Sequence, residues 1–296
     1  MNRVKELVCA DEVYKKGYSG RNIRIALLDT GVSRHPDLDG RVVAFRDFVN
    51  QRPFCYDDHG HGTHIAGILC GSGRNSHGMF SGLAPKAELV VLKVLDENGN
   101  GSTEVAHLAF QWLKEHYKEY RIRLLNFSMG YLPGTDTQNQ RILLQDIDDL
   151  WDAGVCVVTA AGNNGPGKQT ITIPGISRKV ITVGACDDRY GSSAGLRMGY
   201  SGKGPTACCV VKPEILAPGT NVVSLNYEND RYISKSGSSM AVPVVCGALA
   251  LALEKDVTLS PALLKLQLYE SVEREQNTGM QHWGRLQVDR LISMLG

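Results

Sequence analysis

The feature that most constrains the fold is a set of short runs that are apolar at every position. Residues 26–28 read "ALL", residues 89–92 read "LVVL" and residues 155–160 read "VCVVTA". Strands of this kind are buried on both sides, as in a parallel sheet covered by helices. We therefore expect an α/β fold with three layers, in which a mostly parallel, twisted β-sheet lies between helices on both faces.

Longer helical patterns alternate with these runs along the chain. Residues 103–120 and 139–154 have apolar side chains at helical spacing, while residues 122–130 and 179–188 continue the strand-like series. This alternation is typical of parallel sheets with helical crossovers. Residues 185–236 have weak helical periodicity and predict an irregular or antiparallel edge. Because no linker or internal repeat divides residues 1–296, we expect one domain.

Composition excludes several classes of protein. The 296 residues are 43% hydrophobic and 21% charged, and 32 Lys and Arg balance 31 Asp and Glu without long blocks, which argues against a nucleic-acid partner. No apolar stretch is long enough to predict a membrane span, and neither a signal peptide nor a propeptide is evident. We expect a cytoplasmic protein with eight reduced cysteines. It would be secreted if the chain is a mature fragment.

A histidine cluster in "DDHGHGTHIAG", residues 57–67, has three possible roles, namely metal binding, acid-base chemistry or a solvated loop. The apolar positions that follow predict a helix beginning near His61. The glycines on either side of His61 break strand character, so His59 and His61 should point in different directions. This favours acid-base chemistry, and a metal hydrolase remains the alternative.

Three further residues stand at the ends of predicted elements. Asp29 directly follows a buried strand, where α/β sheets place their sites, although such an aspartate is often a cap. Ser239 precedes a long apolar segment, so it should lie at the N-terminus of a buried helix, where backbone N–H groups favour an anion or the serine simply caps the helix. Asn163 ends another strand and could donate to an oxyanion or form a turn.

These residues occur in motifs that resemble the subtilisin-like serine proteases. The motifs are "LLDTGV" around Asp29, "HGTHIAG" from His61, "AAGNNG" around Asn163 and "GSSMAVP" around Ser239, in the family's order. Similar wording continues through residues 35–38, 81–96, 124–130, 174–185 and 212–224, and it is closest to the intracellular bacterial subtilases. The resemblance extends from about Val8 to the helical segment near Lys265.

The resemblance implies a serine endopeptidase with a peptide or protein substrate. Ser239 would be the nucleophile, His61 the general base and Asp29 the residue that orients the imidazole. The Asn163 side chain and the Ser239 backbone N–H would form the oxyanion hole. His59 would then be a loop neighbour, and His64 a packing residue. A catalytically silent fold with a binding or regulatory role is the alternative.

Substrate-binding residues are also implied by the resemblance. The peptide cleft would be lined by Ser128, Met129, Gly130, Ala160, Ala161 and Gly162. Thr172 stands where the family often has glycine at the floor of the main specificity pocket, so that pocket should be shallower. Thr103, where an aromatic residue is common, would leave a more open remote pocket.

Two departures from the family pattern concern the nucleophile and calcium. Ser238 replaces the usual threonine before Ser239 and keeps a hydroxyl, and Met240 should be sensitive to oxidation. The chemistry needs no cofactor. Many relatives hold a structural calcium between the aspartate equivalent to Asp37 and a later loop. Here that loop, residues 71–82, has no carboxylate and contains Arg74, so calcium binding stays an open question.

Overall fold

The central element of the computed structural model, which describes residues 1–131, 137–188, 195–196, 198–274 and 282–295, is an eight-stranded sheet with the order β10-β7-β6-β5-β4-β1-β3-β2. Every neighbouring pair in it is parallel. The strands are β1 (Arg24–Asp29), β2 (Val42–Asp47), β3 (Glu88–Lys93), β4 (Ile122–Phe127), β5 (Cys156–Ala160), β6 (Ile181–Ala185), β7 (Ile215–Ala217) and β10 (Gly284–Arg285).

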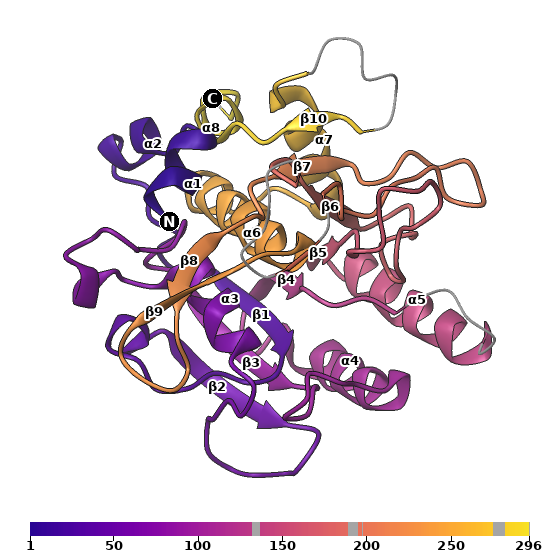
Figure 1. Cartoon of the computed structure of the whole chain (residues 1–296), viewed down its shortest axis with the longest axis horizontal. Helices are drawn as coiled ribbons and strands as arrows, with labels where there is room; N and C mark the ends of the chain where they lie inside the picture. Colours follow the sequence, from indigo (N-terminus) through magenta and orange to yellow (C-terminus); the bar gives the residue numbers. More distant parts are fainter. Residues whose placement is uncertain (132–136, 189–194, 197, 275–281, 296) are drawn as a thin grey trace.

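Helices surround this sheet in the described part of the chain (Figure 1). The α-helices are α1 (Asn2–Leu7), α2 (Asp11–Lys15), α3 (His61–Cys70), α4 (Thr103–His116), α5 (Thr137–Asp152), α6 (Ser238–Lys255), α7 (Pro261–Ser271) and α8 (Val288–Ser293). Two short 3-10 turns are η1 (Pro36–Leu38) and η2 (Arg74–Ser76).

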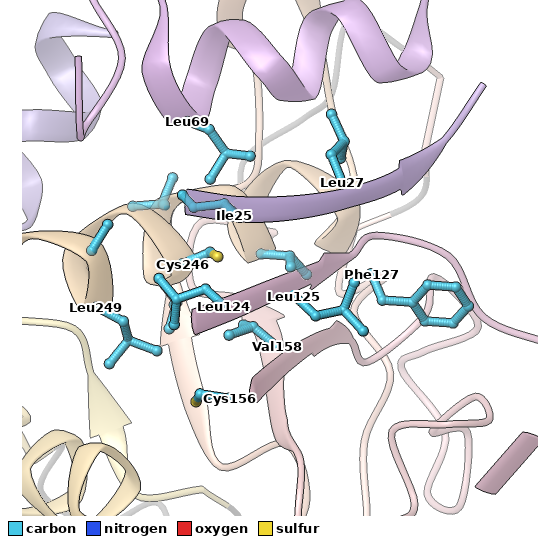
Figure 2. Close-up of a cluster of buried hydrophobic side chains, with 14 of the residues drawn as sticks. Ile25, Leu27, Leu69, Leu124, Leu125, Phe127, Cys156, Val158, Cys246 and Leu249 are labelled. Atoms are coloured by element: carbon cyan, nitrogen blue, oxygen red, sulfur yellow. The ribbon is translucent and has the colours of Figure 1, made fainter. Parts of the chain in front are cut away.

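The side chains of β4 show that helices cover both faces of the sheet. Helix α6 packs against β4, and Figure 2 shows its Cys246 and Leu249 on the side to which Leu124 points. Phe127 lies three positions along the strand, so it points to the opposite face. There its ring packs on Phe110 of α4, with the ring centroids 5.6 Å apart. The expected three-layer α/β fold is therefore confirmed.

Helix α6 corrects one expectation. Its 18 residues are long and apolar enough to cross a membrane by length and composition, contrary to the expectation that no such stretch exists. In the structure, 83% of this segment is buried inside the protein, where it contacts α3 and the strands from β4 to β7. Its all-round apolar surface is that of a central core helix.

The expected antiparallel edge is present in part. Strands β8 (Val222–Leu225) and β9 (Tyr232–Lys235) form an antiparallel hairpin that lies beside α3 (Figure 1). In contrast, β7 belongs to the central parallel sheet, between β6 and β10. Three residues are too short to show a periodic pattern, which is why the sequence did not reveal this strand.

The topology brings several chain segments to one edge of the sheet. β5, β4 and β1 are neighbours, and Ala160, Phe127 and Asp29 are their last residues. Because the strands are parallel, their carboxyl ends meet at the same edge, where α/β proteins place their sites. Asp29 therefore lies near the loops that begin at Ser128 and Ala161.

Candidate active site

His61 and Asp29 form a closely paired imidazole and carboxylate. Nδ1 of His61 donates to Asp29, with distances of 2.7 and 2.9 Å to the two carboxylate oxygens. Asp29 is fully buried at the end of β1 and also accepts the backbone N–H of Thr30 at 2.8 Å. The carboxylate fixes the ring so that its Nε2 atom remains available for other chemistry.

The close approach of α3 to β1 depends on Gly62. A Cβ atom at this position would lie 2.1 Å from the carbonyl oxygen of Gly31 and 3.1 Å from Cβ of Asp29. No larger residue fits there without moving backbone. Gly62 thus lets the first turn of α3 bring His61 onto Asp29.

Asp57 organises the loop before His61. One of its carboxylate oxygens accepts the hydroxyl of Thr30 and the N–H groups of His59 and Gly60, at 2.8 to 3.1 Å. The other accepts the N–H and the hydroxyl of Thr63 at 2.9 and 2.6 Å. Five hydrogen bonds to one buried side chain hold the start of α3 against the end of β1.

Ser239 is the second residue of α6 and is half-buried. Its hydroxyl donates to the backbone carbonyl of Ser128 at 2.7 Å, and the described residues give no hydrogen bond between this hydroxyl and His61. Both side chains nevertheless line the same cavity. Rotation about the Cα–Cβ bond of Ser239 would turn its hydroxyl away from Ser128.

Asn163 is anchored to the segment that carries Ser239. Its Oδ1 atom accepts both the backbone N–H and the hydroxyl of Ser238, at 2.9 and 3.0 Å. Gly237 has φ of +152°, and a Cβ there would lie 3.2 Å from Nδ2 of Asn163. With Oδ1 engaged, the amide N–H groups of Asn163 are the donors left to face the cavity that it lines.

The cavity measures about 310 Å³. Of the predicted site residues it contains His61, Ser128, Met129, Gly130, Ala160, Gly162, Asn163, Thr172 and Ser239. Asp29 lies behind His61. Ala161 is an exception, because it is fully buried, its N–H donates to Val183 and its carbonyl accepts from Thr172. The backbone N–H and carbonyl of Ala161 therefore both already take part in hydrogen bonds within the fold. Thr103 begins α4 and does not line this cavity.

Thr172 fills the space between the two sides of the cavity. A Cβ on Gly130 would lie 2.1 Å from its Oγ1 atom, and a Cβ on Gly162 would lie 2.5 Å from its Cγ2 atom. The threonine itself is only 3% exposed. A side chain at Gly130 or Gly162 would therefore require Thr172 to move.

The geometry of the histidine cluster favours separate roles over shared metal binding. The rings of His59 and His61 have centroids 6.3 Å apart and are tilted by 49°. His64 is fully buried, and its Nε2 contacts the carbonyl oxygens of Val222 and Ile233 at 3.1 Å each. Among the residues that the structure describes, no three His, Cys, Asp or Glu side chains are placed to hold one metal ion.

Comparison with known proteins agrees with this geometry. The family model described as "Subtilase family" matches residues 20–287. The chain is a subtilase. It is 37% identical to "Serine protease AprX" of Bacillus subtilis over 286 residues, or 90% of this chain and 65% of that protein. It is 34% identical to "Subtilisin DY" of Bacillus licheniformis over 265 residues, covering 88% of each.

A solved structure gives the same result for the fold. The structure titled "Crystal structure of a cold adapted subtilisin-like serine proteinase" matches with a TM-score of 0.74 and 27% identity, covering 92% of this chain and 90% of that one. The resemblance seen in the motifs is thereby confirmed. This subtilase spans 65% and 59% of the lengths of the first two curated relatives, AprX and the "Thermostable alkaline protease" of Halalkalibacterium halodurans.

Sequence reasoning missed several residues of the subtilase site. Leu95, Asn98, Gly99 and Asn164 line the cavity and were not named from the sequence, while His59 and Ser238, which were named as neighbours of His61 and Ser239, line it too. The place of His59 near the cavity could have been expected, since it stands two residues before His61. Burial lowers the pKa of its imidazole. Nothing in the sequence indicated a role for Lys235. Its ammonium group donates to the carbonyl of Gly60 at 3.0 Å and so ties the end of the β8–β9 hairpin to the histidine loop.

Proposed function

We propose that this subtilase is a serine endopeptidase in which Ser239, His61 and Asp29 act together. The observation that carries the proposal is the buried carboxylate of Asp29 on Nδ1 of His61, with the opposite side of the ring in the cavity that also contains Ser239. In this arrangement His61 accepts the proton of the Ser239 hydroxyl as oxygen attacks the peptide carbonyl. It later delivers that proton to the leaving amine.

The negative charge that develops on the carbonyl oxygen needs nearby donors. The amide of Asn163 supplies one, because Ser238 already holds its oxygen. The backbone N–H of Ser239, in the first turn of α6, supplies the other, and the N-terminal end of this 18-residue helix favours negative charge. Binding of substrate would move the Ser239 hydroxyl from Ser128 toward His61.

A fluorescent fluorophosphonate tests this proposal directly. The wild-type protein should be labelled and should hydrolyse peptides, whereas Ser239→Ala and His61→Ala should do neither. Ser238→Ala is the matched control, because it removes the neighbouring hydroxyl and should still be labelled. If folded wild-type protein is neither labelled nor active, the silent regulatory alternative replaces the proposal. Activity that a chelator abolishes and the phosphonate leaves intact would favour a metal hydrolase.

The cavity also suggests a substrate preference. Thr172 occupies the space between Gly130 and Gly162, so the pocket for the residue on the acyl side of the cleaved bond is shallow. We expect cleavage after small residues such as alanine in preference to phenylalanine. The position of Thr172 beside Gly130 and Gly162 supports the expectation from the sequence that this pocket is shallow.

Substitution Thr172→Gly tests the preference. Deleting the side chain should raise kcat/KM for a phenylalanine substrate relative to an alanine substrate by about 10- to 100-fold. Thr170→Gly, two residues away and outside the cavity, is the control and should leave the ratio unchanged. An unchanged ratio in Thr172→Gly would show that another residue limits the pocket.

The cysteines support a reducing compartment. All eight are free, and Cys9, Cys208 and Cys209 are exposed. We propose that the protein works in the cytoplasm, where such thiols stay reduced. Alkylation of intact cells before lysis should modify the exposed thiols and leave no disulfide-linked peptides in mass spectra. Disulfides found in this experiment would argue for an oxidising compartment.

A further inference from the structure

The surroundings of Asp37 do not fit the calcium site that many relatives hold there. Asp37 lies in η1, is fully buried, and has both carboxylate oxygens occupied by protein donors. Oδ1 accepts the backbone N–H of Asn75 at 2.8 Å. Oδ2 accepts the phenolic O–H of Tyr232 at 2.8 Å. A calcium ion needs six to eight oxygen ligands whose lone pairs face it, and here hydrogen atoms face the carboxylate instead.

Other groups around Asp37 also disfavour a cation. Nδ1 of His35 accepts the backbone N–H of Asp37 at 3.1 Å, so the ring proton is on Nε2, a buried donor without a hydrogen-bond partner among the described residues. The loop itself contains Arg74. At its far end, the ammonium group of Lys5 donates to the hydroxyl of Ser81. The loop thus has positively charged neighbours and no carboxylate of its own.

Tyr232 joins three separate segments of the chain. It belongs to β9, and its hydroxyl reaches η1 through Asp37. Its ring packs on Phe80 of the 71–82 loop, with the ring centroids 4.6 Å apart, and on the edge of His35 at 5.8 Å. Burial raises the pKa of its phenol to about 12, so the hydroxyl remains a donor at neutral pH.

We propose that the Tyr232–Asp37 hydrogen bond takes the structural place of calcium in this chain. It links η1, the 71–82 loop and the β8–β9 hairpin without a metal ion. The link matters for the site because the same hairpin contacts His64, ties to Gly60 through Lys235 and leads into Ser239. Folding stability should therefore be independent of calcium and dependent on one phenolic hydroxyl.

Thermal unfolding tests this inference. The measurement is made in a Ser239→Ala background, because this variant should not digest itself. Unfolding is read without any activity assay. The melting midpoint should be the same in excess EDTA and in excess CaCl₂. Adding Tyr232→Phe should lower it by roughly 3–8 °C in both buffers, because the Oδ2 atom of a buried carboxylate loses its donor. Tyr227→Phe is the matched control, since the Tyr227 hydroxyl contacts only the exposed Glu228 in the described structure.

The outcomes separate cleanly. A calcium-dependent rise in the midpoint of the parent protein would overturn the inference, whatever the variants do. A calcium-independent parent with Tyr232→Phe as stable as Tyr227→Phe would overturn the role of the hydroxyl. Loss of folding in Tyr232→Phe alone, with the parent insensitive to calcium, is the extreme form of the expected result.

Discussion

Two histidine–aspartate pairs in this protein have nearly the same local geometry and very different surroundings. His61 contacts Asp29 at 2.7 Å, and His107 of α4 contacts Asp146 of α5 at 2.5 Å. Both carboxylates are buried, with side chains 0% and 4% exposed. Judged by this contact alone, either pair could serve a serine nucleophile.

The partners of the two carboxylates differ. Asp146 also accepts from Gln111 and from Lys114, each at 3.0 Å, so its charge is shared among donors that tie α4 to α5. Outside its own loop backbone, Asp29 has His61 as its only side-chain donor among the described contacts. One carboxylate joins two helices, and the other is dedicated to a single imidazole.

The two imidazole rings also differ in what lies on the side away from the aspartate. His61 faces a cavity that contains Ser239 and Asn163, whereas His107 is 39% exposed on a helix surface and lines no part of that cavity. A paired imidazole becomes useful for acyl transfer when its free nitrogen faces a nucleophile and an oxyanion site. A histidine–aspartate pair is therefore a weaker indicator of function than the residues that line the cavity next to its imidazole.

Alanine substitution of the two histidines should give the largest difference in activity between the two pairs. We expect His61→Ala to reduce kcat/KM by ~10⁴–10⁶-fold, a range that rests on the loss measured when subtilisin itself is stripped of its catalytic histidine. His107→Ala should change kcat/KM by less than about twofold, because its position is remote from the cavity. Steady-state hydrolysis of one peptide by both variants measures this. Comparable losses in the two variants would mean that the cavity is misassigned.

The aspartates should differ in the kind of damage that follows their neutralisation. Asp29→Asn should lower kcat by ~10⁴-fold, as in related triads, because the amide favours the wrong tautomer of His61. Asp146→Asn should leave kcat unchanged and reduce the free energy of unfolding by about 1–3 kcal/mol, because three partly exposed donors lose a charged, buried acceptor. Kinetics and denaturant unfolding of both variants distinguish these effects. A drop in kcat for Asp146→Asn would refute the division of roles.

The motifs predicted the components of the site better than their contacts. Asp29, His61, Asn163 and Ser239 were identifiable because each follows a strand end or begins a helix, and parallel topology brings such positions together. The role of Asp57 could not be predicted, because its five hydrogen bonds depend on how the loop folds. Ala161 was assigned to the cleft by the family resemblance, and its backbone N–H donates to Val183 of strand β6.

Some of the fold was equally predictable, and for physical reasons. Fully buried strands such as β5 have a continuous apolar sequence, so the sheet was evident. Tyr232 and Lys235 gave no signal, since each acts on a segment more than 170 residues away along the chain. Long-range polar contacts of this kind leave no local pattern in a single sequence.

Asn163 tests the part of the site that has no counterpart at His107. We expect Asn163→Ala to lower kcat by ~10²–10³-fold with little change in KM, a range measured for subtilisin, because its amide acts on charge that develops after binding. Asn164→Ala is the control, since Asn164 is the next residue and lines the same cavity, whereas Asn163 is the one whose Oδ1 accepts from Ser238. Equal effects of the two substitutions would argue against a specific oxyanion role.

A third histidine sharpens the comparison, because His64 is buried without any carboxylate partner among its described contacts. Burial lowers the pKa of its imidazole to about 3 from an ordinary value of 6.5. Between these pH values the unfolded state binds the additional proton, so His64 contributes stability above pH 6.5 that is lost as the pH falls toward 3.

In a Ser239→Ala background, His64→Gln should flatten the dependence of unfolding free energy on pH by up to about 1.4 kcal/mol per pH unit within this window. An unaltered slope in His64→Gln would show that the fold already accommodates a charged imidazole between α3 and the β8–β9 hairpin.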